Sequence, residues 1–311
     1  MLPLLASLCM SQSGQSFDTS QLWWIANDGR FAASGRNELK LFGSFKSNHS
    51  TKERIFQVMD KQGNLLAVGT GRQFEQLPQG ARWQEESLEL LAMSDANRWA
   101  ALLPPSKYAR DNRRILAFID RSGKDWTRNR FQKVDLPKDV VAFPLRLEAI
   151  GNDAYLTLSL RRMTTDPKLI HVTDRVVCYR ASSGTNLRQT WSHRLPSTAA
   201  RYERDNGDLA VVGASRTGVV YRIPRDSRKV SLWTKRDGKT RQLELPVAAR
   251  DIFAVWLTDS RAFLVDRSEA VYVCNLPKVK WSRWAGKFAS ISPDGKWVLL
   301  LADTQRLIRR I

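Results

Sequence analysis

Cysteine and histidine are scarce in this sequence, with three residues of each type among 311. Cys9, Cys178 and Cys274 lie far apart, so they predict neither a disulfide framework nor a short-spaced pair of metal ligands. We therefore predict no metal site and expect Cys178 and Cys274 to pack in the core. So few cysteines suit a reducing compartment, which favours the cytoplasm.

Long apolar runs are also missing. The longest, such as residues 297–302, are far too short to span a bilayer, so we expect no transmembrane segment. The first residues, MLPLLASLCMSQSGQS, are loosely similar to a signal peptide but lack a basic stretch at the start. If they are the remnant of a signal peptide, the protein is periplasmic or secreted, and this alternative to the cytoplasm stays open.

Motifs for catalysis and cofactor binding are missing too. The chain has no Gly-x-Ser-x-Gly nucleophile turn and no glycine-rich phosphate loop. The segment Asp205-Asn206-Gly207-Asp208 is similar to part of a calcium-binding loop, but it lacks the remaining acidic ligands and suits a hairpin turn. We expect no enzymatic activity, and we assign no catalytic, cofactor-binding or metal-binding residues.

Short strands and tight turns fill the sequence instead. Helical periodicity is nearly absent, and its best candidate, residues 83–91, is one or two turns long. Six segments share one pattern: an apolar alternation, a turn rich in Asp, Asn and Gly, and a second alternation, which together predict a β-hairpin. These hairpins begin at Gln21, Glu89, Arg146, Tyr202, Asp251 and Phe288.

A second hairpin follows most of the first ones. Its first strand is short and β-branched, as in RIFQVMD, RILAFID and RVVCYRA, and its second strand carries a tryptophan such as Trp126, Trp191 or Trp233. The repeating unit is thus four antiparallel strands and a crossover, which needs roughly 40–50 residues, the size of a propeller blade. A β-sandwich pair, the rival fold, does not predict this recurring unit.

The recurrence predicts an all-β chain that forms a single β-propeller domain of about six four-stranded blades. The last unit lacks a fourth strand of its own, and we predict that residues 4–10 complete it beside residues 305–311, so that the N-terminal strand closes the ring. Seven blades and a truncated propeller are the alternatives. The approximate blades are residues 20–78, 79–137, 138–196, 197–246, 247–285, and 286–311 together with 1–10.

Three segments resemble the repeats of known propellers. SPDGKW, residues 292–297, resembles the hairpin of WD-repeat-like propellers, while residues 176–191 and, more weakly, 219–233 resemble the repeat of quinoprotein-like propellers. This resemblance to the WD-repeat-like and quinoprotein-like superfamily, of the pyrroloquinoline-quinone type, implies a propeller fold. Quinoprotein enzymes also carry a calcium site and often an adjacent cysteine pair; neither is found in this sequence, so we predict no cofactor.

The balance of charge is strongly basic. The net charge is +19, from 50 basic and 31 acidic residues, and such a field favours polyanionic surfaces. Arginine and lysine cluster in two stretches, residues 107–133 and 216–241, beside predicted turns. The candidate contacts for a polyanion are Arg113, Arg114, Arg128, Arg130, Arg225, Arg228, Lys229, Lys235 and Arg236.

The function that the sequence favours is a non-catalytic protein-interaction scaffold, because a closed ring is rigid and its loops supply a variable surface. We therefore expect a protein partner. The first alternative is electrostatic binding of nucleic acid, an acidic protein or another polyanion through basic rim loops, with steep dependence on salt. The second alternative is a propeller enzyme with a site at the mouth of the channel.

Overall fold

A computed structural model gives the fold of the chain. The described part contains strands, turns and one short 3-10 helix, η3 (Ala249–Asp251). No helix in it has the length and apolarity that a membrane crossing requires. The structure describes residues 9–11, 23–27, 31–34, 39–42, 50–53, 55–59, 65–70, 82–85, 90–95, 97–103, 114–120, 130–134, 140–163, 169–182, 186–196, 201–203, 211–223, 228–276, 278–302 and 305–310.

The N-terminal half of the described chain forms four antiparallel sheets. The first contains β2 (Trp23–Ile25), β3 (Phe31–Ser34), β4 (Leu39–Phe42) and β5 (Ser50–Glu53). The second contains β6 (Ile55–Met59), β7 (Leu65–Thr70) and β8 (Arg82–Glu85), with β6 in the middle. The third contains β9 (Leu90–Met93), β10 (Arg98–Leu103), β11 (Arg114–Asp120) and β12 (Arg130–Val134). The fourth contains β13 (Val141–Ile150), β14 (Asp153–Met163), β15 (Leu169–Ser182), β16 (Arg188–Arg194) and β17 (Arg201–Glu203), which pairs with β15.

Two further sheets follow. One contains β18 (Val211–Ser215), β19 (Gly218–Arg222), β20 (Lys229–Thr234) and β21 (Thr240–Glu244). The other has seven strands in the order β1-β27-β26-β25-β24-β23-β22. Its members are β22 (Ile252–Leu257), β23 (Arg261–Asp266), β24 (Ala270–Asn275), β25 (Lys280–Ile291), β26 (Trp297–Ala302), β27 (Gln305–Arg310) and β1 (Cys9–Ser11).

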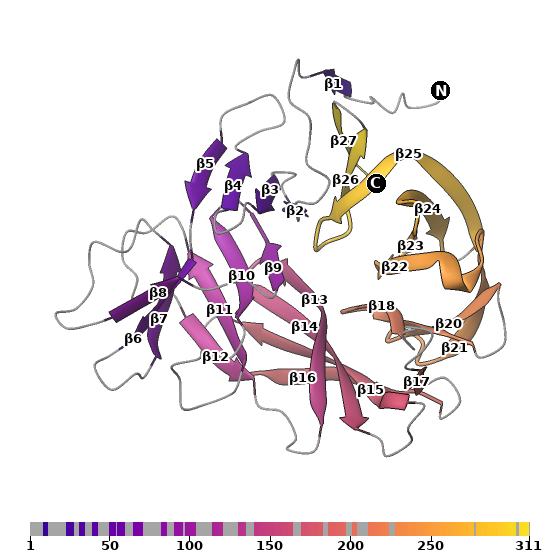
Figure 1. The fold of residues 1–311 in the computed structure, drawn as a ribbon, viewed down its shortest axis with the longest axis horizontal. Coiled ribbons are helices and arrows are strands. Elements are labelled where there is room, and N and C mark those ends of the chain that lie inside the picture. The colour runs from indigo at the N-terminus through magenta and orange to yellow at the C-terminus, as the bar shows by residue number, and fades with distance from the viewer. Residues whose placement is uncertain are drawn as a thin grey trace.

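The sheets stand around a common centre, except that of β6, β7 and β8, which lies on the outside next to β11 and β12 (Figure 1). Strand β2 contacts β9, β9 contacts β13, β13 contacts β18, and β18 contacts β22. The sheet that begins with β22 leads on to β25, which contacts β2 again. Across that sheet, the rings of Trp256 on β22 and Phe288 on β25 lie 4.1 Å apart between centroids. The predicted all-β propeller arrangement is therefore confirmed.

The hydrophobic core lies between neighbouring sheets. One cluster joins Ala26, beside β2, to β9, β10 and β11, and another joins Val176 and Trp191 of the fourth sheet to Val219 and Tyr221 of the next. Strands such as β10, with the sequence RWAALL, are buried on both faces because a sheet covers each side. Several strands therefore have continuous runs of apolar residues in the sequence, and not a regular alternation of apolar and polar residues.

The predicted number of about six four-stranded blades is not what the sheets show. Four sheets have the four or five strands of a blade, and the other two have three and seven. The predicted boundary between residues 285 and 286 falls inside β25, because this strand pairs with β24 over residues 280–287 and with β26 over residues 287–291. One long strand, β25, thus belongs to two of the predicted blades.

The predicted first unit, residues 20–78, also differs from the structure. Residues 39–53, which the pattern leaves unassigned, supply β4 and β5 to the first sheet. Strand β6, which lies within the segment RIFQVMD, pairs instead with β7 and β8 in a separate sheet, whose β7 packs against β11 and β12. The helical candidate at residues 83–91 is not found either, because its residues 83–85 and 90–91 belong to β8 and β9, while residues 86–89 lie outside the described residues.

The fifth sheet begins later than predicted. The hairpin pattern that starts at Tyr202 places a turn at residues 205–208, which lie outside the described residues. Strand β17, just before them, pairs with β15, and the first hairpin of the sheet is β18 and β19 around Arg216 and Thr217. Residues 218–222, which follow the hairpin predicted from Tyr202, therefore form the second strand of this sheet and not the third.

The two ends of the described chain lie side by side. Strand β1 pairs antiparallel with β27, with Cys9 opposite Leu307 and Ser11 opposite Gln305. This confirms the predicted pairing for residues 9 and 10, while residues 4–8 lie outside the described residues. The N-terminal strand is thus the outermost strand of the seven-stranded sheet (Figure 1).

Candidate functional site

One end of the ring is formed by the turns between the first two strands of the sheets, and Asn27 connects several of them. Its main-chain N–H donates to the Ser94 carbonyl oxygen at 3.2 Å, and its side-chain Nδ2 donates to the Ala149 carbonyl oxygen at 3.0 Å. The N–H of Asp294 donates to Asn27 Oδ1 at 2.8 Å, and Trp297 Nε1 donates to the Asn27 carbonyl oxygen at 3.1 Å. Asn27 therefore ties the first sheet to three others.

Further contacts between turns continue around this end. The buried Glu148 carboxylate accepts the main-chain N–H of Arg216 at 2.6 Å, and the Arg216 guanidinium donates to Asp259 at 3.0 Å. Gly295, with φ +75°, lies so close to Thr258 that a Cβ there would be 2.3 Å from Thr258 Cγ2. We conclude that this end of the ring is a rigid frame.

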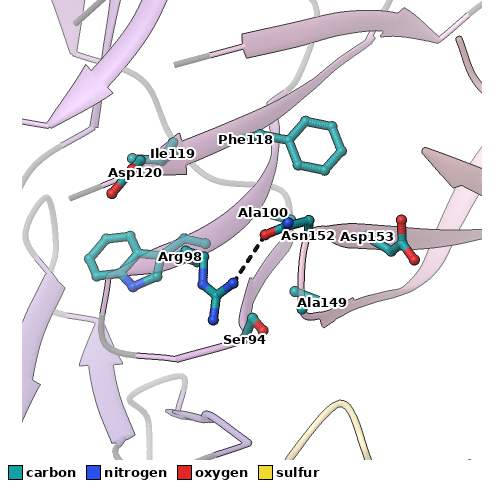
Figure 2. A pocket seen from close by; sticks show the side chains of 11 residues that line it. Ser94, Arg98, Ala100, Phe118, Ile119, Asp120, Ala149, Asn152 and Asp153 are labelled. Atoms are coloured by element: carbon teal, nitrogen blue, oxygen red, sulfur yellow. Dashed lines mark hydrogen bonds between the residues drawn. The ribbon is translucent and has the colours of Figure 1, made fainter. Parts of the chain in front are cut away.

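A small cleft opens at the same end between β9–β10 and β13–β14 (Figure 2). Arg98 Nη1 donates to Asn152 Oδ1 at 3.0 Å across it, and the same guanidinium pairs with Asp95 at 2.6 Å. Although burial acts in the opposite direction, hydrogen bonds from Asn97 and Arg98 hold the pKa of Asp95 below its usual value. The cleft measures about 150 Å³, which is room for little more than one side chain.

A larger cavity, about 490 Å³, lies in the channel and opens towards the opposite end. Its walls are residues 145–146 of β13, 211–214 of β18 and 252–256 of β22, together with Arg222 and Arg267. Both β18 and β22 begin here, since Val211 and Ile252 are their first residues. Arg222 ends β19 and Arg267 follows β23, so both arginines lie at this same end.

Arg146 and Glu148 form a buried ion pair in the channel. Arg146 Nε lies 3.7 Å from Glu148 Oε1, and the two side chains are 9% and 2% exposed. Burial lowers the pKa of Arg146, while the Glu148 carboxylate partly offsets this. Burial raises the pKa of Glu148, although Arg146 and the Arg216 N–H act against that shift. Because charges are costly to bury, such a pair needs a structural or functional reason.

Bulky apolar side chains accompany the arginines in this cavity. Phe253 is 73% exposed and lies in its wall together with the half-buried Trp256. The pairing of β22 with β23 is irregular between Ile252 and Ala254, at Phe253 itself. Such bulges redirect a side chain out of the regular alternation, and this one leaves Phe253 in solvent.

The predicted polyanion contacts fall on two separate sheets. Arg114 begins β11 and Arg130 begins β12, while Arg228 and Lys229 lie at the start of β20. Lys235 and Arg236 lie in the turn that follows β20, at the other end of that strand. The whole fourth sheet separates the two groups. Arg113, Arg128 and Arg225 lie outside the described residues, and binding of a polyanion by this set stays a prediction.

Several tryptophans link adjacent sheets. Trp191 Nε1 donates to the Arg216 carbonyl oxygen at 2.9 Å, and its ring lies 5.2 Å from that of Trp233. Trp281 Nε1 donates to the Glu244 carbonyl oxygen at 2.7 Å. The predicted core positions of the cysteines are also confirmed, because Cys178 and Cys274 are buried and free.

The sequence pattern misses the buried pair in the channel. Arg146 and Glu148 are two residues apart on one strand, so they point to the same face while Leu147 points to the other. Opposite charges at this spacing inside an apolar strand are the signal that could have identified them. Across the described residues, no group of three His, Cys, Asp or Glu side chains is placed to hold a metal ion.

Comparison with solved structures finds only distant likeness for the chain described below. No family model matches this sequence, and no curated protein matches it. A chain in a solved structure entitled "Crystal Structure of Mitotic Checkpoint Complex" is similar over 99% of this chain and 95% of that chain, with 7% identity and a TM-score of 0.44. This similarity is too low to support the fold assignment, so the propeller arrangement is assigned from the sheets of this chain alone.

Proposed function

We propose that this protein is a non-catalytic interaction scaffold that holds a segment of a partner protein at the channel end where β18 and β22 begin. The observation that carries the proposal is the 490 Å³ cavity with Phe253 exposed in its wall. Specific ligand pockets commonly measure about 300–1,000 Å³, and bulky aromatic side chains supply much of the energy of protein interfaces.

The surroundings of the cavity support a polypeptide ligand. Strands β13, β18 and β22 are each the terminal strand of their sheet, so each has one edge that its own sheet does not cover. An extended polypeptide can pair with such an edge and place alternate side chains in a pocket. The frame of hydrogen-bonded turns at the other end keeps these edges fixed, which reduces the entropy lost on binding.

The proposal is tested by selecting short displayed peptides against the full chain and measuring their affinity for variants. Phe253→Asp should weaken the selected peptides by about tenfold or more, because it places a carboxylate where an aromatic contact is expected. Arg188→Asp, which alters an exposed residue of β16, is the matched control and should leave their affinity unchanged. Peptides that bind wild type and Phe253→Asp equally well would show that the cavity is not the binding site.

A further inference from the structure

Three arginines line the channel cavity, and none of the described residues that line it is acidic. Arg146 lies within the channel, while Arg222 and Arg267 lie at the open end. Glu148 approaches Arg146 from the far side, towards the turn that contains Arg216, to whose main-chain N–H it is bound. The cavity itself is therefore electropositive.

The guanidinium of Arg146 has an unused donor. Its Nε faces Glu148, but its Nη1 is buried and has no hydrogen-bond partner among the residues that the structure describes. An arginine carries five N–H donors in a planar fork, and leaving one buried and unpaired costs free energy. A carboxylate is the side-chain group that matches this fork best.

The two arginines at the open end are held in place by the main chain. Arg222 Nη1 donates to the Ala249 carbonyl oxygen at 2.5 Å, and Arg267 Nε donates to the Arg250 carbonyl oxygen at 3.0 Å. Both carbonyls belong to η3, the short helix just before β22. This anchoring fixes two positive charges beside Phe253 before any ligand arrives, so little side-chain entropy remains to be lost on binding.

We propose that the cavity binds an extended acidic peptide segment, with an aspartate or glutamate carboxylate on the Arg146 guanidinium and an apolar neighbour against Phe253. The proposal deepens the proposed function and rests on it, since it names the chemistry of the partner segment. The apolar walls that Val211, Ala214 and Val255 contribute favour a peptide, which has apolar side chains to place against them, over the phosphate backbone of a nucleic acid.

The test compares paired synthetic peptides derived from the displayed sequences that bind the full chain. One member of each pair has its acidic residue and the other has the isosteric amide, glutamate against glutamine or aspartate against asparagine. We expect the amide form to bind about tenfold or more weakly to wild type, because a charge-assisted hydrogen bond is lost. This comparison changes only the ligand, so it does not depend on how a variant of the protein folds.

The same pairs are then measured on the double variant Arg146→Met/Glu148→Gln. It removes both buried charges together, while the glutamine can still accept the Arg216 N–H. On this variant the acidic and amide peptides should bind equally. Arg188→Met, which removes one exposed positive charge from β16, is the control and should preserve the preference for the acidic peptide.

Each alternative outcome is decisive. Equal affinity of acidic and amide peptides for wild type overturns the carboxylate site, although loss of binding in Phe253→Asp would still support the proposed function. If Arg188→Met loses the preference for the acidic peptide as fully as the double variant does, the preference is a general effect of charge, and the role of Arg146 is overturned. Displacement of the acidic peptides by a short oligodeoxythymidine, with the same dependence on Arg146, assigns the cavity to nucleic acid instead.

Discussion

Replacing Asn27 tests whether one side chain holds the ring together across several sheets. In Asn27→Ala, the Asp294 N–H and the Ala149 carbonyl both lose their side-chain partner. Leaving a buried polar main-chain group unpaired costs about 1–3 kcal/mol. Ala149 is 3% exposed, whereas Asp294 and Asn27 are only half-buried, so we expect a total loss of about 2–4 kcal/mol in the free energy of unfolding.

The assay is urea denaturation followed by tryptophan fluorescence. With a denaturant slope of about 3 kcal/mol per molar, such a loss lowers the midpoint by about 1 M. Asn152→Ala is the matched control, since it removes one exposed hydrogen bond from Arg98 and should cost about 0.5 kcal/mol or less. Asn27→Asp should fall between the two, because it keeps the acceptor for Asp294 but loses the donor to Ala149. If Asn27→Ala unfolds no earlier than Asn152→Ala, Asn27 does not join the sheets as described.

Three further predictions concern the packing between and within sheets. The His193 ring stacks on Trp233 with 4.8 Å between centroids, and burial lowers the pKa of His193. The stability of the folded protein should therefore fall as the pH drops below about 6.5, and His193→Phe should show a weaker pH dependence of the melting temperature. The same pH dependence in wild type and variant would contradict this prediction. Gly213→Ala should separate β18 from β22, because its Cβ would lie 1.9 Å from the Val255 carbonyl oxygen, and a wild-type melting temperature would refute this contact. Burial raises the pKa of Cys178 to about 11, so an alkylating reagent at neutral pH should modify it only after denaturation, and rapid labelling of the folded protein would be the contrary result.

Much of the fold is predictable because each repeat contains its own hairpin signals. The hairpins β9–β10 and β13–β14 are good examples, since turns rich in Asn, Asp and Gly separate their apolar strands. The predicted extent of the first blade, residues 20–78, is wrong because apolar and polar residues alternate only weakly in residues 39–53. The pairing of these residues is decided by the neighbouring hairpin. The boundary at residue 285 was wrong because β25 continues without a turn from one sheet partner to the next.

The candidate site was less predictable because it depends on which strands lie next to the channel. Basic residues near turns were visible in the sequence, but those that line the cavity come from three different sheets. Asn27 illustrates the same limit. Its position after an apolar strand predicts a turn, yet its hydrogen bonds reach residues more than a hundred positions away, which no local pattern encodes.

Hydrogen exchange of the full chain, with and without a selected acidic peptide, tests most directly whether the channel cavity is the binding site. Amides in residues 211–214 and 252–256 line the cavity, so their exchange should slow on binding. Exchange in β16, on the outer side of its sheet, should not change. Slowing that is confined to outer strands, or that is absent from both cavity segments while the peptide is bound, would contradict the account.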